Sequence, residues 1–254
     1  MDEYLWFVTS FYQLSGIDLG QYKRPQMERR LTNIRNRRGY EHFSNYFAAL
    51  QQNKSLMDEL LDKMTINVSE FFRNPDRWAQ VRKLLVERGV KHPLRAWSAA
   101  CATGEEPYSL AILLEEAGLQ YDEIMATDID LRVLESAKKG IFEKRSVANL
   151  SDTVLNSYFT VSDSKYIIRP SLKKHVAFSQ HNLLSDAYPN TLDIIVCRNV
   201  LIYFTKDAKQ MILGKFSTSL RPGGLLFVGS TEQLMGFMVP SLKLVAPFIY
   251  EKQA

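Results

Sequence analysis

The sequence has few of the residues that hold disulfide-rich or metal-binding proteins together. Its 254 residues include only two cysteines, Cys101 and Cys197, and four histidines. Two cysteines this far apart give neither a disulfide framework nor the paired spacing of a metal site, so we expect no bound metal. A reducing, cytoplasmic setting fits this cysteine usage best.

Long hydrophobic runs are also missing. The longest uncharged stretch near the start, residues 4–17, is too short to span a bilayer and is broken by Thr, Ser and Gln. Asp2 and Glu3 stand where a secretory signal would carry Lys or Arg. We therefore expect no direct insertion into a membrane. A hydrophobic content of 46% is ample for a core, and the length allows one large domain or two unequal ones.

Excess positive charge is confined to one stretch. Residues 21–40 contain seven Lys or Arg and one Glu, whereas the rest of the chain contains 25 basic and 27 acidic residues. Clustered like charges repel one another, which favours a surface that faces a partner over one that only keeps the protein in solution. Nucleic acid and an acidic protein surface are both candidate partners. No aromatic residues alternate with the arginines, which weakens the RNA interpretation.

Helical periodicity dominates residues 1–66. Apolar residues recur at helical spacing before the first glycine, and Pro25 marks the first turn of a second helix that ends near Gly39. Most arginines of this second helix fall on the side opposite its apolar residues. Two further helices are expected at about 41–51 and 54–64. The pattern predicts a small helical domain.

The residues after this domain lead into another helix. It is expected over 75–88, with Asn74 as its N-cap and a proline in its first turn. Asn67, Ser69 and Arg73 come just before it, beside an aromatic pair. Spacing alone gives these three polar residues no role beyond capping a short helix or facing solvent.

From Leu94 onward strands alternate with helices, which predicts a parallel sheet flanked by helices. After the strand that opens this region, further strands are expected at 123–127, 176–178, 192–197, 225–230 and about 244–251. Residues 141–175 interrupt the alternation with a polar half and two strand-like pieces, which predicts a β-hairpin insertion. The closing helix, Pro-Gly-Gly turn, strand and antiparallel pair are typical of a methyltransferase sheet, and a nicotinamide-binding sheet has no particular need of them.

Residues 95–114 join a short strand, a turn of small residues and a helix. The turn from Ala99 to Glu106, with Gly104 near its end, lets a nucleoside ligand approach the backbone closely. The helix begins with Glu105 and Glu106, so a phosphate at its N-terminus would meet two negative charges. A positively charged ligand suits this turn better, and we expect S-adenosylmethionine, which carries an ammonium and a sulfonium.

Polar residues follow the next expected strands as well. Asp128 comes at the end of the second strand, where a carboxylate can accept both ribose hydroxyls in a doubly wound fold. Asn182 follows the third strand and is placed to bond an adenine amino edge. His181 beside it is interpreted as an ordinary loop histidine. Arg198 and Asn199 follow the buried central strand.

Five segments carry a resemblance to a known family. They are Asn67–Arg73, Trp97–Ser109, Ala126–Asp130, Cys197–Phe204 and Leu226–Glu232. Together, though not singly, they are highly specific, and the chain resembles the chemotaxis receptor glutamate methyltransferases of the CheR type over nearly its whole length. The resemblance implies an α/β protein: a small all-helical N-terminal domain, then a class I, Rossmann-like methyltransferase domain dependent on S-adenosylmethionine, with a small β-subdomain insertion.

The resemblance also implies how the chain is divided. Residues 1–66 would form the helical domain that docks on the receptor, and 67–92 a linker helix region that contributes to the donor site. Residues 93–254 would form the methyltransferase domain, with the β-subdomain at about 141–175.

Individual roles follow where residues match the family's motifs. The turn and the resemblance together assign the donor site to Asn67, Ser69, Arg73, Ala99, Gly104, Glu106, Asp128, Asn182, Leu183, Arg198 and Asn199. Arg73 would also orient the incoming carboxylate, and Tyr203 would line the methyl slot or donate a hydrogen bond, although spacing alone leaves Tyr203 as a core aromatic residue. Some relatives carry Thr at the position of Ser69, so the hydroxyl is kept, and Cys101 replaces a smaller residue.

The implied substrates are methyl-accepting chemotaxis receptors. The enzyme would esterify glutamates of their acidic cytoplasmic methylation region and release S-adenosylhomocysteine, working in the cytoplasm after recruitment to membrane receptor arrays. The receptor-binding residues would be Arg29, Arg30, Arg35, Arg37 and Arg38. Members that grip a receptor's C-terminal pentapeptide tend to carry a glycine-containing extension in the β-subdomain. Here the loop 162–165 is short and lacks glycine, so we expect a pentapeptide-independent enzyme.

Two other functions remain open from the residues. A nucleic-acid methyltransferase would use the arginines for phosphate contacts, but it normally needs an Asn/Asp-Pro-Pro-aromatic motif where this chain has Arg198-Asn-Val-Leu. We therefore expect no nucleic-acid partner. A non-catalytic domain could instead bind S-adenosylmethionine, or its demethylated product, as a signal.

Overall fold

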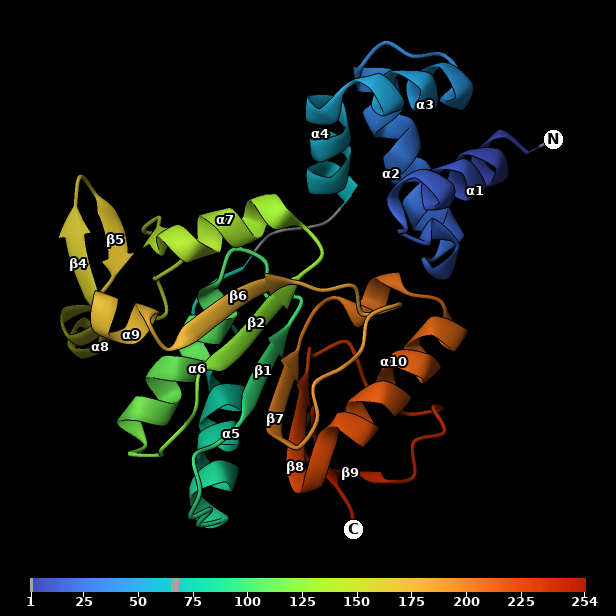
Figure 1. The fold of residues 1–254 in the computed structure, drawn as a ribbon. Helices are drawn as coiled ribbons and strands as arrows, with labels where there is room; N and C mark the ends of the chain where they lie inside the picture. The colour runs from blue at the N-terminus through green and yellow to red at the C-terminus, as the bar shows by residue number, and fades with distance from the viewer. Residues whose placement is uncertain (1, 65–68) are drawn as a thin grey trace.

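The structure, a computed structural model, describes residues 2–64 and 69–254, so Asn67 lies outside the described residues. The first range is helical, with α1 Glu3–Ser15, the 3-10 turn η1 Leu19–Gln21, α2 Arg24–Arg37, α3 Phe43–Gln52 and α4 Lys54–Met64. These helices lie together in Figure 1. They enclose their own apolar cluster, which includes Phe7, Leu31 and Tyr46. The expected helical N-terminal unit is confirmed.

The second range contains a seven-stranded sheet. Its strands are β1 Ala96–Ala99, β2 Ile124–Asp128, β6 Val176–Gln180, β7 Leu192–Cys197, β8 Leu220–Val228, β9 Leu242–Ala246 and β10 Ile249–Lys252. The order is β6-β2-β1-β7-β8-β10-β9, and β10 runs in the direction opposite to the other six strands. The strand order reverses between β1 and β7, and ligands of such sheets bind beyond the carboxyl ends of the strands at that point.

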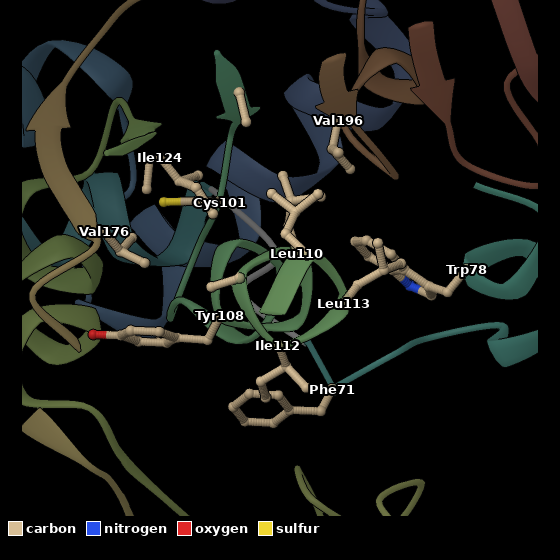
Figure 2. Packing of buried hydrophobic residues seen from close by; sticks show 14 of the residues in the cluster. Phe71, Trp78, Cys101, Tyr108, Leu110, Ile112, Leu113, Ile124, Val176 and Val196 are labelled. Carbon is tan, nitrogen blue, oxygen red and sulfur yellow. The ribbon is translucent and has the colours of Figure 1, made fainter. Parts of the chain in front are cut away.

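The central strands are apolar on both faces because helices cover both faces. Ala96, Ile194 and Val196 face one apolar cluster, whereas Trp97 and Ile195 face the other, as the alternation of side chains along a strand requires. The first face is covered by α5 Pro75–Glu87, α6 Glu105–Glu116 and α7 Leu131–Lys139, and the second by α10 Lys206–Ser219 (Figure 1). Figure 2 looks along α6, whose apolar side chains point outward on several sides.

The insertion after α7 forms a small separate sheet. It consists of β3 Ile141–Phe142, α8 Asp152–Tyr158, β4 Phe159–Ser162, β5 Lys165–Ile168 and α9 Pro170–Lys173, with strand order β3-β5-β4. Asp163 and Ser164 join β4 to β5 with φ of 47° and 62°, the left-handed pair of a tight two-residue hairpin turn. The expected hairpin is present. β3 and α9 were not expected, because elements of two and four residues leave no readable periodicity.

The helical unit is joined to the carboxyl edge of the large sheet by backbone hydrogen bonds. Lys23 N donates to Tyr203 O at 2.8 Å, and Thr205 N donates to Gln21 O at 2.8 Å. Between these bonds the rings of Tyr22 and Phe204 lie 4.8 Å apart. This junction places α2 beside the loop that follows β7.

Two local expectations were wrong. The last strand, expected at 244–251, is two antiparallel strands, since the chain reverses at Phe248, which has a φ of 67°. Asn74 precedes α5, but its side chain makes no capping bond. Its Oδ1 instead accepts hydrogen bonds from Arg198 Nη2 at 2.8 Å and Ser230 Oγ at 3.2 Å, so a tertiary contact has replaced the local one.

Across the described ranges, none of the helices has the length and apolar character needed to cross a bilayer.

Candidate functional site

A large pocket opens at the carboxyl ends of β1, β2 and β7, beside the helical unit. The space between its lining atoms is about 1120 Å³ when the open solvent at its entrance is included. Its wall combines the sheet edge with Ser69, Glu70 and Arg73 of the segment before α5 and with Met27 and Arg30 of α2.

The floor of the pocket is the turn after β1. Ala100 and Ala102 have φ of 63° and 47°, in the left-handed region, and both line the pocket. Gly104 has a φ of 97°, and a Cβ there would lie 2.9 Å from the Cβ of Ala137 on α7. Glycine is therefore required where the turn packs against α7, and only small residues separate the ligand space from the backbone.

The two acids at the start of α6 point to different places. Glu105 accepts hydrogen bonds from Thr103 Oγ1 at 2.6 Å and Ser146 Oγ at 3.1 Å, on the side of the insertion. Glu106 lines the pocket and accepts one from Ser98 Oγ at 2.8 Å. Its carboxylate forms no ion pair within the described ranges. Burial raises the pKa of Glu106 to about 7, although the nearby Arg198 lowers it.

Asp128 occupies the opposite side of the floor, at the end of β2. Its Oδ2 accepts a hydrogen bond from Ala102 N at 2.9 Å and its Oδ1 one from Asp130 N at 3.1 Å. Burial raises the pKa of this carboxyl, and the two backbone bonds oppose the rise. Each oxygen keeps a free lone pair, so a pair of ribose hydroxyls can bind here.

The segment after β6 closes one end of the pocket with His181, Asn182 and Leu183. Asn182 Oδ1 accepts a hydrogen bond from Leu184 N at 3.0 Å, which fixes the loop. His181 packs edge-on against Trp97, with ring centroids 5.2 Å apart, and its Nε2 has no partner among the described residues. Burial lowers the pKa of His181, so its ring is neutral at physiological pH.

Arg73 lies in a strained segment. Phe72 and Asn74, on either side of it, have φ of 49° and 61°, and a left-handed conformation costs a non-glycine residue about 1–3 kcal/mol. Arg198 stabilises this segment, since its Nη2 donates hydrogen bonds to both Arg73 O and Asn74 Oδ1 at 2.8 Å. The Arg198 guanidinium lies 4.6 Å from the ring centroid of Phe227, and burial lowers its pKa.

A buried carboxylate organises the loop that carries Tyr203. Glu232 accepts hydrogen bonds from Asn199 N at 2.7 Å, Gly229 N at 2.7 Å and Ile202 N at 3.2 Å. A Cβ on Gly229 would lie 2.5 Å from Glu232 Oε2, so this position has no room for a side chain. Burial raises the pKa of Glu232, while these backbone bonds lower it.

Tyr203 meets the helical unit at the pocket mouth. The Arg30 guanidinium lies 5.6 Å from its ring centroid and donates a hydrogen bond to Met64 O. Burial raises the pKa of Tyr203, so its phenol stays protonated at neutral pH and can donate a hydrogen bond. One basic residue of α2 is therefore part of the pocket wall.

The other arginines of this helix differ in their partners. The Arg35 guanidinium lies 4.5 Å from the ring centroid of Phe43, and Arg38 pairs with Glu59. Arg29 and Arg37 are exposed, and neither forms an ion pair within the described residues. The free positive charge of α2 is thus smaller than its composition suggests.

Most of the sequence-predicted site residues come together in this pocket. Its wall includes Ser69, Arg73, Glu106, Asp128, Asn182, Leu183, Arg198, Asn199 and Tyr203. Ala99 and Gly104 are buried behind the floor and do not line it, and Ala100, Cys101 and Ala102 take their place. Asn67 cannot be placed, since it lies outside the described residues.

Sequence reasoning missed several pocket residues. Tyr22, Met27 and Met64 come from the helical unit, and no local pattern connects them with residues of the sheet. His181 was interpreted as an ordinary loop residue, although its place beside Asn182 was a usable signal. Glu232 does not line the pocket; it belongs to the Leu226–Glu232 motif, but its hydrogen bonds to the 199–202 loop depend on tertiary contacts.

The chemistry of the wall fits a nucleoside that carries positive charge. Glu106 offers a carboxylate without an ion-pair partner, Asp128 offers two acceptors, and the small floor permits close approach. Within residues 2–64 and 69–254, no three His, Cys, Asp or Glu side chains group as metal ligands would.

Known protein families match both the helical unit and the region that contains the large sheet. The family described as "CheR methyltransferase, SAM binding domain" matches residues 67–243, and "CheR methyltransferase, all-alpha domain" matches residues 2–65. The chain is similar to the chemotaxis protein methyltransferase of Listeria monocytogenes, with 39% identity over 98% of this chain and 97% of the relative. It is also similar to the chemotaxis protein methyltransferase of Salmonella typhimurium, with 36% identity over 87% of this chain and 80% of the relative.

Proposed function

The chain belongs to the CheR methyltransferase family, and from this premise we propose that it methylates glutamate side chains of chemoreceptors, using S-adenosylmethionine as donor. The observation that carries the proposal is the division of the pocket. Among its lining residues, Glu106 and Asp128 are buried carboxylates, whereas Arg73, Arg30 and Tyr203 are partly exposed. A cationic donor is favoured beside the two carboxylates, and an anionic acceptor beside the partly exposed arginines.

The donor half is supplied by the sheet edge. Glu106 faces the positively charged part of the donor, Asp128 accepts from the ribose hydroxyls, and Asn182 and Leu183 contact the adenine. S-adenosylmethionine supplies an electrophilic methyl group on a sulfonium; as the new O–CH₃ bond forms, the S–CH₃ bond breaks and S-adenosylhomocysteine remains. A glutamate has an ordinary pKa of about 4.3 and is already ionised at neutral pH, so the chain needs no general base.

The acceptor half has to position the carboxylate. Arg73 orients it, and the Tyr203 phenol, kept protonated by burial, donates a hydrogen bond to it or lines its path. The nucleophilic oxygen and the methyl carbon must approach to about 3–3.5 Å in line, and this positioning supplies most of the rate acceleration. The hydrogen bond from Arg198 to Arg73 O and the carboxylate of Glu232 beneath the 199–203 loop support such positioning.

Docking on the acidic methylation region of a receptor is assigned to α2. Arg29 and Arg37 are its exposed arginines without ion pairs among the described residues, so they contribute most to long-range attraction. Arg35 and Arg38 contribute less because Phe43 and Glu59 engage them. The tight turn between β4 and β5 leaves no extended loop, which supports recognition without a C-terminal pentapeptide.

One labelling experiment tests the proposed function. The protein is incubated with methyl-labelled S-adenosylmethionine and a cytoplasmic receptor fragment, with RNA as an alternative acceptor. Base-labile label on the receptor fragment, lost when its glutamates are changed to alanine, is the expected result. Label on RNA, or donor binding without any transfer, contradicts the proposal. The pentapeptide is tested by removing the last five residues of a receptor that has them, which should leave the rate unchanged.

A further inference from the structure

We propose that the insertion after α7 sets the position of Arg73, so that Phe71 and the residues of the insertion that hold it act as positioning residues for methyl transfer. The proposal deepens the proposed function and rests on it, because it takes Arg73 as the residue that orients the acceptor carboxylate. The contacts between Phe71 and the insertion involve no residue that lines the ligand pocket.

Phe71 anchors the segment that leads to Arg73. Its side chain is 0% exposed and belongs to the cluster around α6 (Figure 2), and it does not line the pocket. Its ring centroid lies 4.8 Å from that of Phe142 in β3 and 5.2 Å from that of Phe159 in β4, both edge to face. Side chains from two strands of the insertion therefore pack against the ring of Phe71, which lies two residues before Arg73.

Hydrogen bonds to the backbone of Phe71 connect the same two parts of the chain. Phe71 N donates to Ser146 O at 2.9 Å, and Asn149 Nδ2 donates to Phe71 O at 3.4 Å. Ser146 Oγ in turn donates to Glu105 Oε1 at 3.1 Å, which ties the insertion to the start of α6. The insertion thus satisfies both the amide and the carbonyl of Phe71, in addition to packing on its ring.

Hydrogen bonds also fix the backbone of the residues after Phe71. Phe72 N donates to Ser109 Oγ at 2.9 Å, and Arg198 Nη2 donates to Arg73 O at 2.8 Å. Phe72 and Asn74 both have positive φ, a conformation that persists only where the surroundings impose it. A shift of Phe71 is therefore transmitted to Arg73 instead of being absorbed by a relaxed loop.

This arrangement gives the insertion a role in catalysis without a ligand contact. Among the described residues, the segment before α5 is held by α6, by Arg198, by Ser230 and by the insertion. α6 and Arg198 also contribute side chains to the pocket wall, whereas the insertion contributes none. Weakening the contacts between the insertion and Phe71 should alter the orientation of the Arg73 side chain while leaving the donor pocket intact.

The test uses the full chain with Phe71→Leu, and Phe159→Leu as a second variant should the first fold poorly. Each should lower kcat at least tenfold, while the Kd for S-adenosylhomocysteine, measured by calorimetry, changes less than threefold. Phe11→Leu is the matched control, because Phe11 is equally buried but lies in the helical unit. It should leave kcat within twofold of wild type.

A double-mutant cycle separates positioning from general loss of structure. In an Arg73→Ala background, Phe71→Leu should lower kcat by less than a further twofold, because the residue it positions is gone. An equal fall in both backgrounds, or wild-type kcat in Phe71→Leu and Phe159→Leu, overturns the proposal.

Hydrogen exchange provides a readout that does not depend on turnover. Peptides covering 69–74 should exchange at least threefold faster in Phe71→Leu but not in Phe11→Leu, and unchanged exchange also overturns the proposal. Wild-type turnover in Arg73→Ala would instead refute the role given to Arg73 in the proposed function. An absence of receptor methylation by the wild-type protein would refute the proposed function itself, and the exchange result would still decide whether the insertion holds the segment.

Discussion

Glu106 makes donor binding depend on pH. Its carboxyl has a pKa of about 7 in the ligand-free protein because it is buried without an ion-pair partner in the described structure. A cationic donor favours the ionised carboxylate, so binding below pH 7 must displace a proton. Affinity should therefore fall as the pH is lowered through 7.

The size of this effect follows from the pKa. For a site that must lose one proton with a pKa of about 7, the apparent Kd is about eightfold higher at pH 6 than at pH 7.5. At pH 6 binding should release about 0.9 proton per ligand. An α-amino group has an ordinary pKa of about 8, so the ammonium of the donor keeps most of its charge in this window.

Calorimetry in buffers of different ionisation enthalpy measures both the Kd and the protons released. Glu106→Gln should bind more weakly at pH 7.5 and lose most of the pH dependence. What remains in that variant belongs to the other titratable groups of the pocket, which include Asp128, whose pKa burial raises, and His181, whose pKa burial lowers. A flat affinity between pH 6 and 7.5 in the wild type, or the same slope in Glu106→Gln, would refute the assignment of Glu106 to the cationic part of the donor.

The same group affects the stability of the ligand-free protein. Burial raises the folded pKa of Glu106 above its ordinary value of 4.5 to about 7, so its contribution to stability is fully present below pH 4.5 and is lost as the pH rises through 7. The loss amounts to about 3 kcal/mol at most. Urea unfolding should therefore show Glu106→Gln gaining stability over the wild type between pH 4.5 and 7.5.

Four further variants have defined outcomes. Arg73→Ala and Tyr203→Phe should both lower turnover, Arg73→Ala more severely, because Arg73 orients the acceptor whereas Tyr203 adds at most one hydrogen bond. Reversing the charge of Arg29 and Arg37 should raise KM for the receptor fragment severalfold at low salt and much less at high salt, since the attraction is screened. Glu232→Ala should destabilise the protein by about 2–4 kcal/mol in urea unfolding and lower turnover, because three backbone amides lose their acceptor.

Each of these changes has its own control. Donor binding by calorimetry alongside turnover separates a donor role from an acceptor role, and wild-type turnover in Arg73→Ala would exclude that residue from the mechanism. Lys83→Glu on α5 reverses an exposed charge elsewhere and should leave receptor KM unchanged. If reversing the charges of Arg29 and Arg37 also leaves the KM for the receptor fragment unchanged at low salt, α2 does not dock the receptor. Glu232→Gln, which keeps one acceptor oxygen, should be milder than Glu232→Ala.

Local patterns predicted the fold well because buried strands alternate regularly with amphipathic helices along most of the chain. Alternating strands and helices after Leu94 predicted the parallel sheet, and the small residues up to Gly104 predicted the turn at its carboxyl edge. Errors came where local rules compete with tertiary contacts. Asn74 is a good N-cap by composition, yet its side chain bonds to Arg198 and Ser230 instead.

The sequence by itself determined which residues are available for the chemistry: an acid pair after the turn, an aspartate after the second strand, and an arginine before α5. Only the tertiary structure decided that Glu106 faces the pocket while Glu105 faces the insertion, since helix position alone does not say what each side chain meets. It also decided that Arg30 reaches Tyr203 and that Phe71 lies between strands of the insertion. These contacts join residues far apart in the chain, and they form only when separately folded units pack together.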